Sequence, residues 1–262
     1  MLSTARKGTG VASPVDSAAS DDRLLDGRLI LRQPRRGYRV AIDPVLLAAA
    51  VPARAGDRVL DVGCGVGAAA LCLAWRVPGC RVVGVERDPE LAALARHNAE
   101  VNGMTSRMVV HTADLAALPD ELRNAVFDLV MTNPPYHPRE AGTASKWRDA
   151  ATRESLPLVR WLELCLRRLK PRGWLVVVHR AGRLAELCAA LEARCGDVRI
   201  LPLWPTEEAW RAQRVVVAAR KGGRGESRLL RGLVLHGRDG RFTAEAEAVL
   251  RRGGALELVE RR

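Results

Sequence analysis

The 262-residue sequence lacks an apolar segment long enough to span a membrane. Residues 1–23 also lack the apolar core of a signal peptide and are mostly small or polar. These absences predict a cytoplasmic protein. A chain of this length can bury roughly three quarters of the surface that its unfolded form exposes. We therefore expect a disordered N-terminal tail over residues 1–25 and one α/β domain over residues 26–262, with a basic C-terminal segment.

Clustered cysteines are missing as well. The six cysteines are spread along the chain without a CxxC pair. A zinc site needs clustered thiolates or imidazoles, and a disulfide scaffold is typical of a short secreted chain. The sequence therefore predicts free core thiols and no metal site. The cysteines are Cys64, Cys72, Cys80, Cys165, Cys188 and Cys195.

Lysine is scarce, because nearly all of the 42 basic residues are arginines. The net charge is nevertheless +12, and residues 211–262 hold 13 basic against 6 acidic side chains, a local excess of 13 − 6 = +7. Clustered positive charge attracts polyanions, which makes nucleic acid a natural partner. A GC-rich genome also favours arginine over lysine, so the charge alone leaves the partner open.

Short apolar strands alternate with amphipathic helices along most of the chain. Such alternation predicts a mainly parallel sheet that is covered by helices on both faces. Ligands of such sheets bind beyond the carboxyl ends of the strands. The expected strands span residues 58–61, 81–86, 108–112, 127–132, 174–179, 198–203 and 215–219, and the expected helices begin at residue 43 and span 68–75, 89–101, 158–169, 184–194 and 244–252.

A glycine-rich loop follows the first of these strands. Gly63 and Gly65 satisfy a dinucleotide-binding pattern, so the spacing alone is ambiguous between cofactors. Asp61 precedes the first glycine, and a third glycine falls at Gly67. A pyrophosphate gains little from a neighbouring carboxylate, whereas a ligand with an ammonium and a sulfonium group tolerates one well. These details favour S-adenosylmethionine as the cofactor.

Acidic residues stand at the ends of the next two strands. Glu86 can accept hydrogen bonds from both hydroxyls of a ribose, and Asp114 can accept one from an adenine amino group. Asp43 and Asp88 each precede a proline at a helix start, which is typical of an N-cap residue. We interpret both as caps and keep Asp43 as a further candidate for cofactor binding.

The tetrapeptide Asn133-Pro134-Pro135-Tyr136 follows the fourth strand. An aromatic amine is a poor nucleophile because its lone pair is delocalised into the ring. The Asn133 side-chain oxygen and the Pro134 carbonyl can accept the two N–H hydrogens of such an amine and localise the lone pair. Tyr136 can stack on a base that is drawn out of its helix or loop. The tetrapeptide therefore predicts transfer to an exocyclic amino nitrogen.

Taken together, these residues resemble class I S-adenosylmethionine-dependent methyltransferases and, within that class, the bacterial tRNA1(Val) adenine-N6 methyltransferase family. The resemblance covers about residues 28–220 and continues into the last 40 residues. It is carried by GYRVAIDPVLLAAAVPA at 37–53, DVGCGVGAAALCLA at 61–74, TNPPYHP at 132–138 and LVLHGRDGRFTAEAEAVL at 233–250.

The resemblance implies a Rossmann-like fold with a seven-stranded, mainly parallel sheet and helices on both faces. It also implies an S-adenosylmethionine pocket that includes Gly63, Gly65, Glu86 and Asp114, with Asn133 at the reacting amine and tRNA as the partner. Residues 137–153 lack periodicity and match the family only loosely, and we expect them to form a mobile surface loop near the substrate.

Other functions remain open at this point. Protein glutamine methyltransferases share the NPPY sequence, since an amide nitrogen poses the same chemical problem, but they usually carry a helical N-terminal domain where this chain has a short polar tail. The rRNA guanine-N2 methyltransferases typically have Phe after the prolines. A nicotinamide-dependent oxidoreductase is disfavoured, because no Tyr-x-x-x-Lys pattern occurs. A non-catalytic RNA-binding module is the remaining alternative.

Overall fold

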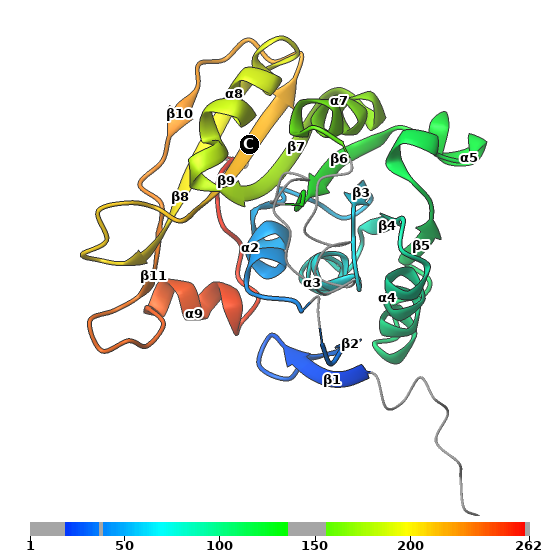
Figure 1. Ribbon diagram of the computed structural model, residues 1–262, viewed down its shortest axis with the longest axis horizontal. Helices are drawn as coiled ribbons and strands as arrows, with labels where there is room; N and C mark the ends of the chain where they lie inside the picture. Colours follow the sequence, from blue (N-terminus) through cyan, green and yellow to red (C-terminus); the bar gives the residue numbers. More distant parts are fainter. Residues whose placement is uncertain (1–18, 37–38, 136–155, 260–262) are drawn as a thin grey trace, which may run out of the picture.

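A computed structural model of the protein describes residues 19–36, 39–135 and 156–259. In these ranges nine strands form one central sheet, and two others pair as a separate hairpin. Helices lie on both faces of the central sheet (Figure 1). This arrangement confirms the predicted α/β fold.

The central sheet has the strand order β5-β4-β3-β6-β7-β9-β8, and both β10 and β11 pair with the outer edge of β8. Only β9 runs antiparallel to its neighbours, so the sheet is mainly parallel, as predicted. The seven expected strands are present, but the count of seven for the sheet is too low, because two short C-terminal strands extend it. The strands are β3 (Arg58–Val62), β4 (Arg81–Glu86), β5 (Met108–Thr112), β6 (Phe127–Thr132), β7 (Leu169–Arg180), β8 (Cys195–Thr206), β9 (Arg214–Lys221), β10 (Arg228–Leu229) and β11 (Leu233–His236).

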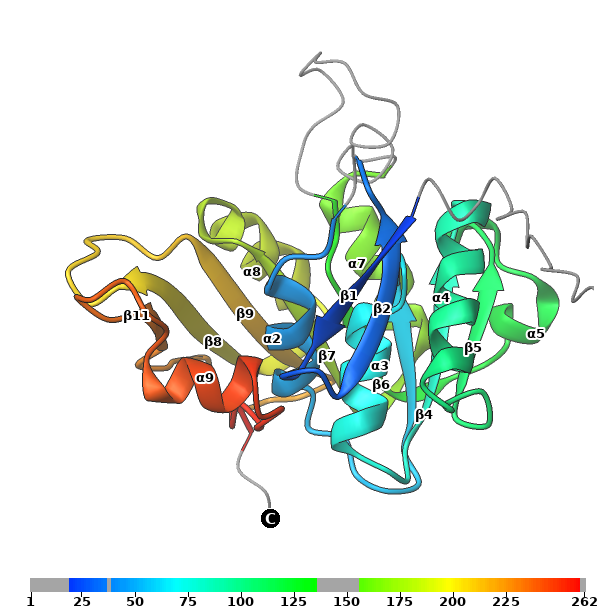
Figure 2. The ribbon, with the colours of Figure 1, turned by 90° about the horizontal axis from the view of Figure 1, so that it is seen from below.

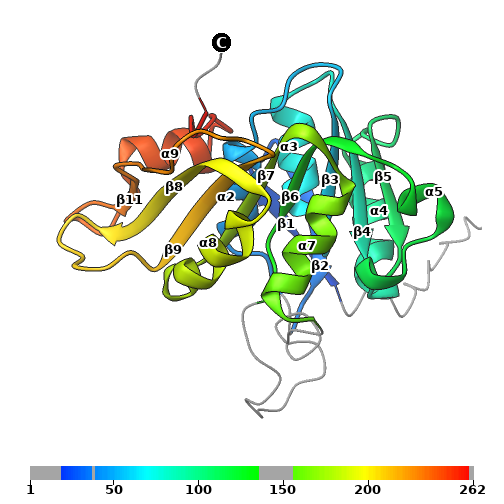
Figure 3. The same ribbon diagram turned by 90° about the horizontal axis from the view of Figure 1, so that it is seen from above.

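Each face of the sheet buries its own apolar cluster. Along β7, Val176 and Val178 point into one cluster, whereas Leu175 and Val177 point into the other. Figure 2 shows the first face, covered by α2 (Asp43–Ala50), α3 (Ala68–Arg76), α4 (Pro89–Val101) and α9 (Ala244–Leu250), and Figure 3 shows α7 (Leu158–Arg168) and α8 (Leu184–Glu192) on the other. Three short helical segments, η1 (Leu115–Ala117), α5 (Asp120–Arg123) and η2 (Ala181–Arg183), join these elements.

An antiparallel hairpin, β1 (Ala19–Leu24) and β2 (Leu29–Pro34), packs beside α4. The prediction of a disordered tail over residues 1–25 is therefore wrong for residues 19–25, and residues 1–18 lie outside the described residues. Strand β1 is polar, but pairing with β2 satisfies its backbone groups. The side chain of Asn98, on α4, fixes the hairpin by accepting from the backbone N–H of Arg32 at 2.7 Å and donating to its carbonyl at 2.8 Å.

Candidate active site

The parallel strands β3, β4, β5 and β6 are neighbours, so their carboxyl ends lie at one edge of the sheet. Asp61 lies one residue before the end of β3, Glu86 is the last residue of β4, and Asn133 directly follows β6. The structure therefore brings these predicted site residues to the same edge, where ligands of α/β sheets bind.

The glycine loop turns from β3 into α3 with three residues in the left-handed region. The φ angles of Gly63, Gly65 and Gly67 are +69°, +55° and +83°, values that favour glycine. A Cβ on Gly67 would stand 2.6 Å from the terminal carbon of Met108, closer than such atoms approach. The backbone N–H of Gly63 donates to the carbonyl of Val85 at 2.8 Å, which holds the loop against the end of β4.

Glu86 links the end of β4 to the glycine loop. Its carboxylate is only 8% exposed and accepts from the backbone N–H of Gly65 and from that of Asp88, each at 2.9 Å. Burial raises the pKa of Glu86, while these two N–H donors act in the opposite direction. Each carboxylate oxygen keeps a second lone pair, so both can still accept from ligand hydroxyls.

Asp61 is a buried carboxyl beneath the same loop. It is 2% exposed, and burial raises its pKa from 3.8 to about 7, with the charge of Glu86 contributing in the same direction and the backbone N–H of Ala70 opposing. Its Oδ2 atom has no hydrogen-bond partner among the residues that the structure describes. A buried acceptor without a partner is costly. The site therefore fits a ligand that brings a cationic or N–H group to this oxygen, as S-adenosylmethionine does.

A hydrogen-bonded connection that the sequence did not reveal joins α7 to this edge. The indole N–H of Trp161 donates to Thr132 Oγ1 at 3.0 Å, and this hydroxyl donates to the carbonyl of Val62 at 2.8 Å. A Cβ on Gly63 would lie 3.1 Å from the Trp161 ring, so the indole also packs against the glycine loop. The sequence predicts only that Trp161 lies in the helix expected over residues 158–169, since a spacing pattern carries no information on partners across the fold.

The segment after β6 lies between two strands at the middle of the edge. Thr132 pairs with Val62 of β3 and with Val177 of β7. The next residue, Asn133, is half-buried, and Pro134 is buried. Tyr136 and the loop predicted over residues 137–153 lie outside the described residues.

The two remaining candidates have other local partners. Asp114 is exposed, and its Oδ1 accepts from the backbone N–H of Ala116 at 2.8 Å, capping η1. Asp43 Oδ2 accepts from Arg214 Nε at 3.0 Å, at the first residue of β9. The N-cap position of α2 is Ile42, so the prediction that Asp43 caps this helix is wrong. A role of Asp43 or Asp114 at the cofactor stays a prediction.

Asp88 is the N-cap residue of α4, as predicted. Its Oδ1 accepts from the backbone N–H groups of Glu90 and Leu91 at 2.9 and 3.1 Å. Two backbone N–H groups of the first helical turn thereby gain an acceptor that lies two residues after Glu86 in the chain. The cap therefore fixes where α4 begins relative to the candidate site.

All six cysteines are free thiols; four are buried in the core as predicted, whereas Cys188 and Cys195 are partly exposed. Over residues 19–36, 39–135 and 156–259, no group of three or more His, Cys, Asp or Glu side chains is arranged to hold a metal ion. In the same ranges, no helix is both long and apolar enough to cross a bilayer.

Comparison with known proteins identifies relatives of this chain. Residues 40–201 match the family model described as the methyltransferase small domain. A tRNA1(Val) (adenine(37)-N6)-methyltransferase from Porphyromonas gingivalis is 33% identical over 177 residues, which are 63% of this chain and 69% of the relative. The matched residues 40–201 include the glycine loop and the Asn133-Pro134-Pro135-Tyr136 segment.

Solved structures show the same fold. A predicted O-methyltransferase from Agrobacterium tumefaciens superposes with a TM-score of 0.68 at 27% identity, covering 81% of this chain and 97% of that one. A T. thermophilus 16S rRNA N2 methyltransferase in complex with AdoMet and guanosine has a TM-score of 0.53 at 23% identity, covering 78% of this chain and 50% of that one. The second likeness concerns the fold alone.

Proposed function

Because this chain belongs to the methyltransferase small domain family, it is an S-adenosylmethionine-dependent methyltransferase, and we propose that its acceptor is N6 of an adenine in a transfer RNA. The observation that carries the choice of an amino acceptor is the position of Asn133 and Pro134. They directly follow β6, whose neighbour β3 leads into the glycine loop. Asn133 and Pro134, which would hold the acceptor, and the glycine loop, which would hold the cofactor, thus follow the ends of adjacent strands.

The residues of the loop fit the cofactor. The left-handed glycines let a ligand approach the backbone, Glu86 keeps lone pairs for ribose hydroxyls, and Asp61 Oδ2 lacks a partner within the described part of the chain. When bound, S-adenosylmethionine supplies a methyl group on a positively charged sulfur. An anionic Asp61 beneath the loop favours a cationic ligand electrostatically.

Asn133 and Pro134 act on the amine. The Asn133 side-chain oxygen and the Pro134 carbonyl accept the two N–H hydrogens, which concentrates the nitrogen lone pair and aims it along one direction. Holding two reactants in line contributes roughly 7–11 kcal/mol to lowering a barrier. The proline ring also fixes φ and removes a competing backbone donor beside this carbonyl.

Two observations support a tRNA substrate. The relative from P. gingivalis acts on an adenine of tRNA1(Val), according to its name. The net charge of +12 favours association with a polyanion. Incubation with labelled S-adenosylmethionine and separate tRNA, rRNA and protein fractions tests the proposal, with nucleoside analysis of the labelled product. We expect N6-methyladenosine in tRNA, whereas label in glutamine or in N2-methylguanosine contradicts the acceptor.

The role of Asn133 is tested by substitution. We expect Asn133→Ala to lower the rate of transfer at least about 100-fold, since the aligned acceptor of the amine is lost. The affinity for S-adenosylmethionine, measured by calorimetry, should stay within a few-fold of the unsubstituted protein. Asn124→Ala is the matched control, because Asn124 is exposed and follows α5. Normal transfer by Asn133→Ala contradicts the mechanism.

A further inference from the structure

Trp210 is the most exposed large apolar side chain among the described residues, with 85% of its surface open to solvent. Tryptophan is usually largely buried in folded proteins. The residue lies in the connection between β8 and β9, residues 207–213, which we call the β8–β9 loop. Binding residues are often carried on surface loops, so this exposed indole is a candidate contact for a partner.

The topology places this loop at the edge of the sheet where Asp61, Glu86 and Asn133 lie. Strand β9 is antiparallel to both β7 and β8, so β8 runs parallel to β7 and β6. The carboxyl end of β8 therefore lies at the same edge as Asn133. From β6 to β8 there are three strand spacings, a separation of about 14 Å. An extended substrate held at Asn133 can reach that far.

The base of the loop is held in place. The backbone N–H of Gln213 donates to the carbonyl of Leu203 at 3.2 Å, and the Gln213 carbonyl accepts from Ala181 at 3.0 Å. An ion pair of 2.9 Å between Arg238 and Glu208 joins the loop to the turn after β11, and Figure 1 shows the two connections side by side. Because the loop is anchored, less ordering entropy is lost when Trp210 binds a partner.

An arginine lies directly beside Trp210. The guanidinium carbon of Arg211 lies 5.1 Å from the centroid of the Trp210 ring, and Arg211 forms no ion pair with the described residues. An aromatic ring next to an available arginine is the combination that proteins use to stack a base and contact its phosphate. Glu207 and Glu208 are also in the loop, and Glu208 is matched by Arg238.

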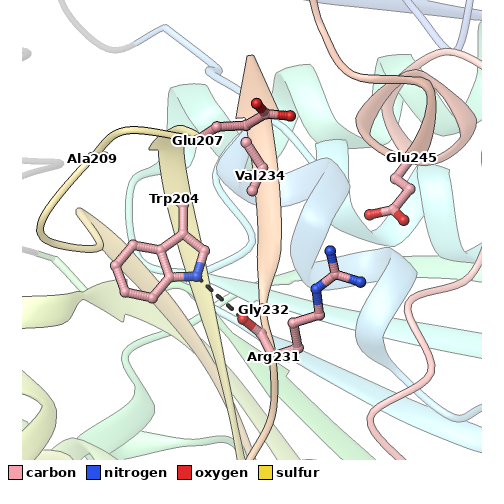
Figure 4. Close-up of a pocket in the computed structure, with 7 residues that line it drawn as sticks. All are labelled: Trp204, Glu207, Ala209, Arg231, Gly232, Val234 and Glu245. Carbon is pink, nitrogen blue, oxygen red and sulfur yellow. Dashed lines mark hydrogen bonds between the residues drawn. The ribbon is translucent and has the colours of Figure 1, made fainter. Parts of the chain in front are cut away.

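A hollow of about 340 Å³ adjoins the loop at the outer edge of the sheet (Figure 4). Arg231 and two carboxylates, Glu207 and Glu245, line it, and the indole of Trp204 donates to the Arg231 carbonyl at 3.2 Å. None of the predicted cofactor residues lines this hollow. Its mixed charges do not indicate one class of ligand, so the inference rests on the exposed ring.

We propose that Trp210, with Arg211, is a second RNA contact that stacks on an unpaired base of the substrate outside the reaction site. The proposal rests on the proposed function, since it assumes that the substrate is RNA. It assigns the β8–β9 loop a part in substrate affinity, separate from the cofactor and from the reacting amine. Stacking needs an unpaired base, so the contact favours a loop of the RNA over a duplex.

The test compares the affinities of Trp210 variants for an unmodified tRNA transcript. We expect Trp210→Ala to weaken binding at least about five-fold, since the aromatic face on which a base stacks is lost. Trp210→Phe keeps an aromatic face and should recover most of the affinity. The affinity for S-adenosylmethionine should not change. Leu229→Ala is the matched control, because Leu229 is another exposed large apolar residue, on β10.

Three results contradict the proposal. If the affinity of Trp210→Ala for tRNA stays within two-fold of that of the unsubstituted protein, Trp210 makes no RNA contact. If the substitution weakens binding of a duplex RNA of matched length equally, the contact is not base stacking. If the unsubstituted protein methylates tRNA normally in these cases, the proposed function stands and only the stacking contact fails. If the unsubstituted protein neither binds nor methylates tRNA, the proposed function fails as well.

Discussion

At the scale of single residues, the candidate site depends on carboxyl groups that the fold buries. Asp61 and Glu86 lie on adjacent strands, and both have raised pKa values because burial disfavours their charged forms. Glu86 is compensated by two backbone N–H donors, whereas Asp61 Oδ2 has no partner among the described residues. The free protein therefore carries an electrostatic cost at Asp61 that a cationic ligand relieves.

We predict that the affinity for S-adenosylmethionine depends on pH through Asp61. Its pKa is about 7 in the free protein, and a cationic ligand favours the ionised form. Binding below pH 7 must therefore release a proton, and the Kd should rise by up to about ten-fold per pH unit as the pH falls. Calorimetry between pH 6 and pH 8 measures this, and a Kd that stays constant over that range contradicts it.

Asp61→Asn is the control for this prediction. It should remove the pH dependence of the Kd that Asp61 causes. The folded pKa of about 7 lies above the ordinary value of 3.8, so the contribution of Asp61 to stability is fully present below pH 3.8 and is lost as the pH rises through 7. At pH 8 and without cofactor, the Tm of Asp61→Asn should therefore exceed that of the unsubstituted protein.

At the scale of elements, α7 is joined to the edge of the sheet that carries the candidate site. The joining hydrogen bonds run from Trp161 to Thr132 and from Thr132 to Val62. These bonds connect a helix, the end of β6 and the end of β3. Asn133 follows Thr132 directly, and Gly63 follows Val62 directly. The network thus sets the position of Asn133, the proposed contact of the acceptor amine, relative to the glycine loop.

We expect Trp161→Phe to slow methyl transfer in single-turnover measurements by about ten-fold, because the phenyl ring cannot donate to Thr132 and leaves the space against Gly63 unfilled. The lost hydrogen bond costs about 1 kcal/mol of stability and the cavity adds to that cost, so the Tm should fall by several degrees. Trp174→Phe is the matched control, since Trp174 is a tryptophan in the middle of β7, six residues before the carboxyl end of the strand. Equal rates for both variants contradict a positioning role.

The elements that were predicted well are those with strong local signals. The expected bounds of β4, β5, β6 and α4 agree with the structure at 81–86, 108–112, 127–132 and 89–101. Their apolar runs and proline-marked start are local signals. Strands β1 and β10 carry polar or exposed side chains and pair only through their backbones, so their sequences hold no such signal.

At the scale of the whole molecule, the net charge of +12 governs association with an anionic substrate. Residues 211–262 hold 13 of the 42 basic residues, but the sheet distributes them between its two edges: Arg211 lies in the β8–β9 loop and Lys221 at the opposite end of β9. Basic residues of this segment therefore lie at both ends of β9, and the excess positive charge attracts a polyanion at long range.

We predict that binding of tRNA weakens steeply with salt. Each phosphate that a basic side chain neutralises adds about −0.9 to the slope of log K against log salt for a duplex and about −0.7 for a single strand. Filter-binding titrations between roughly 50 and 200 mM salt measure the slope. A flat dependence points to a protein or small-molecule substrate. Cofactor affinity, titrated in parallel, is the control and should change little.

The sequence by itself determined the order of strands and helices, the glycine loop and the residues at the strand ends, because apolar periodicity, glycine spacing and proline positions act within a few neighbouring residues. Only the tertiary structure decided the partners of those residues. It pairs Asp43 with Arg214, 171 positions away, instead of leaving it as a helix cap. It also joins Trp161 to Thr132 and leaves Asp61 Oδ2 without a partner in the described chain. Burial and contacts between distant segments set these states, and no local pattern encodes them.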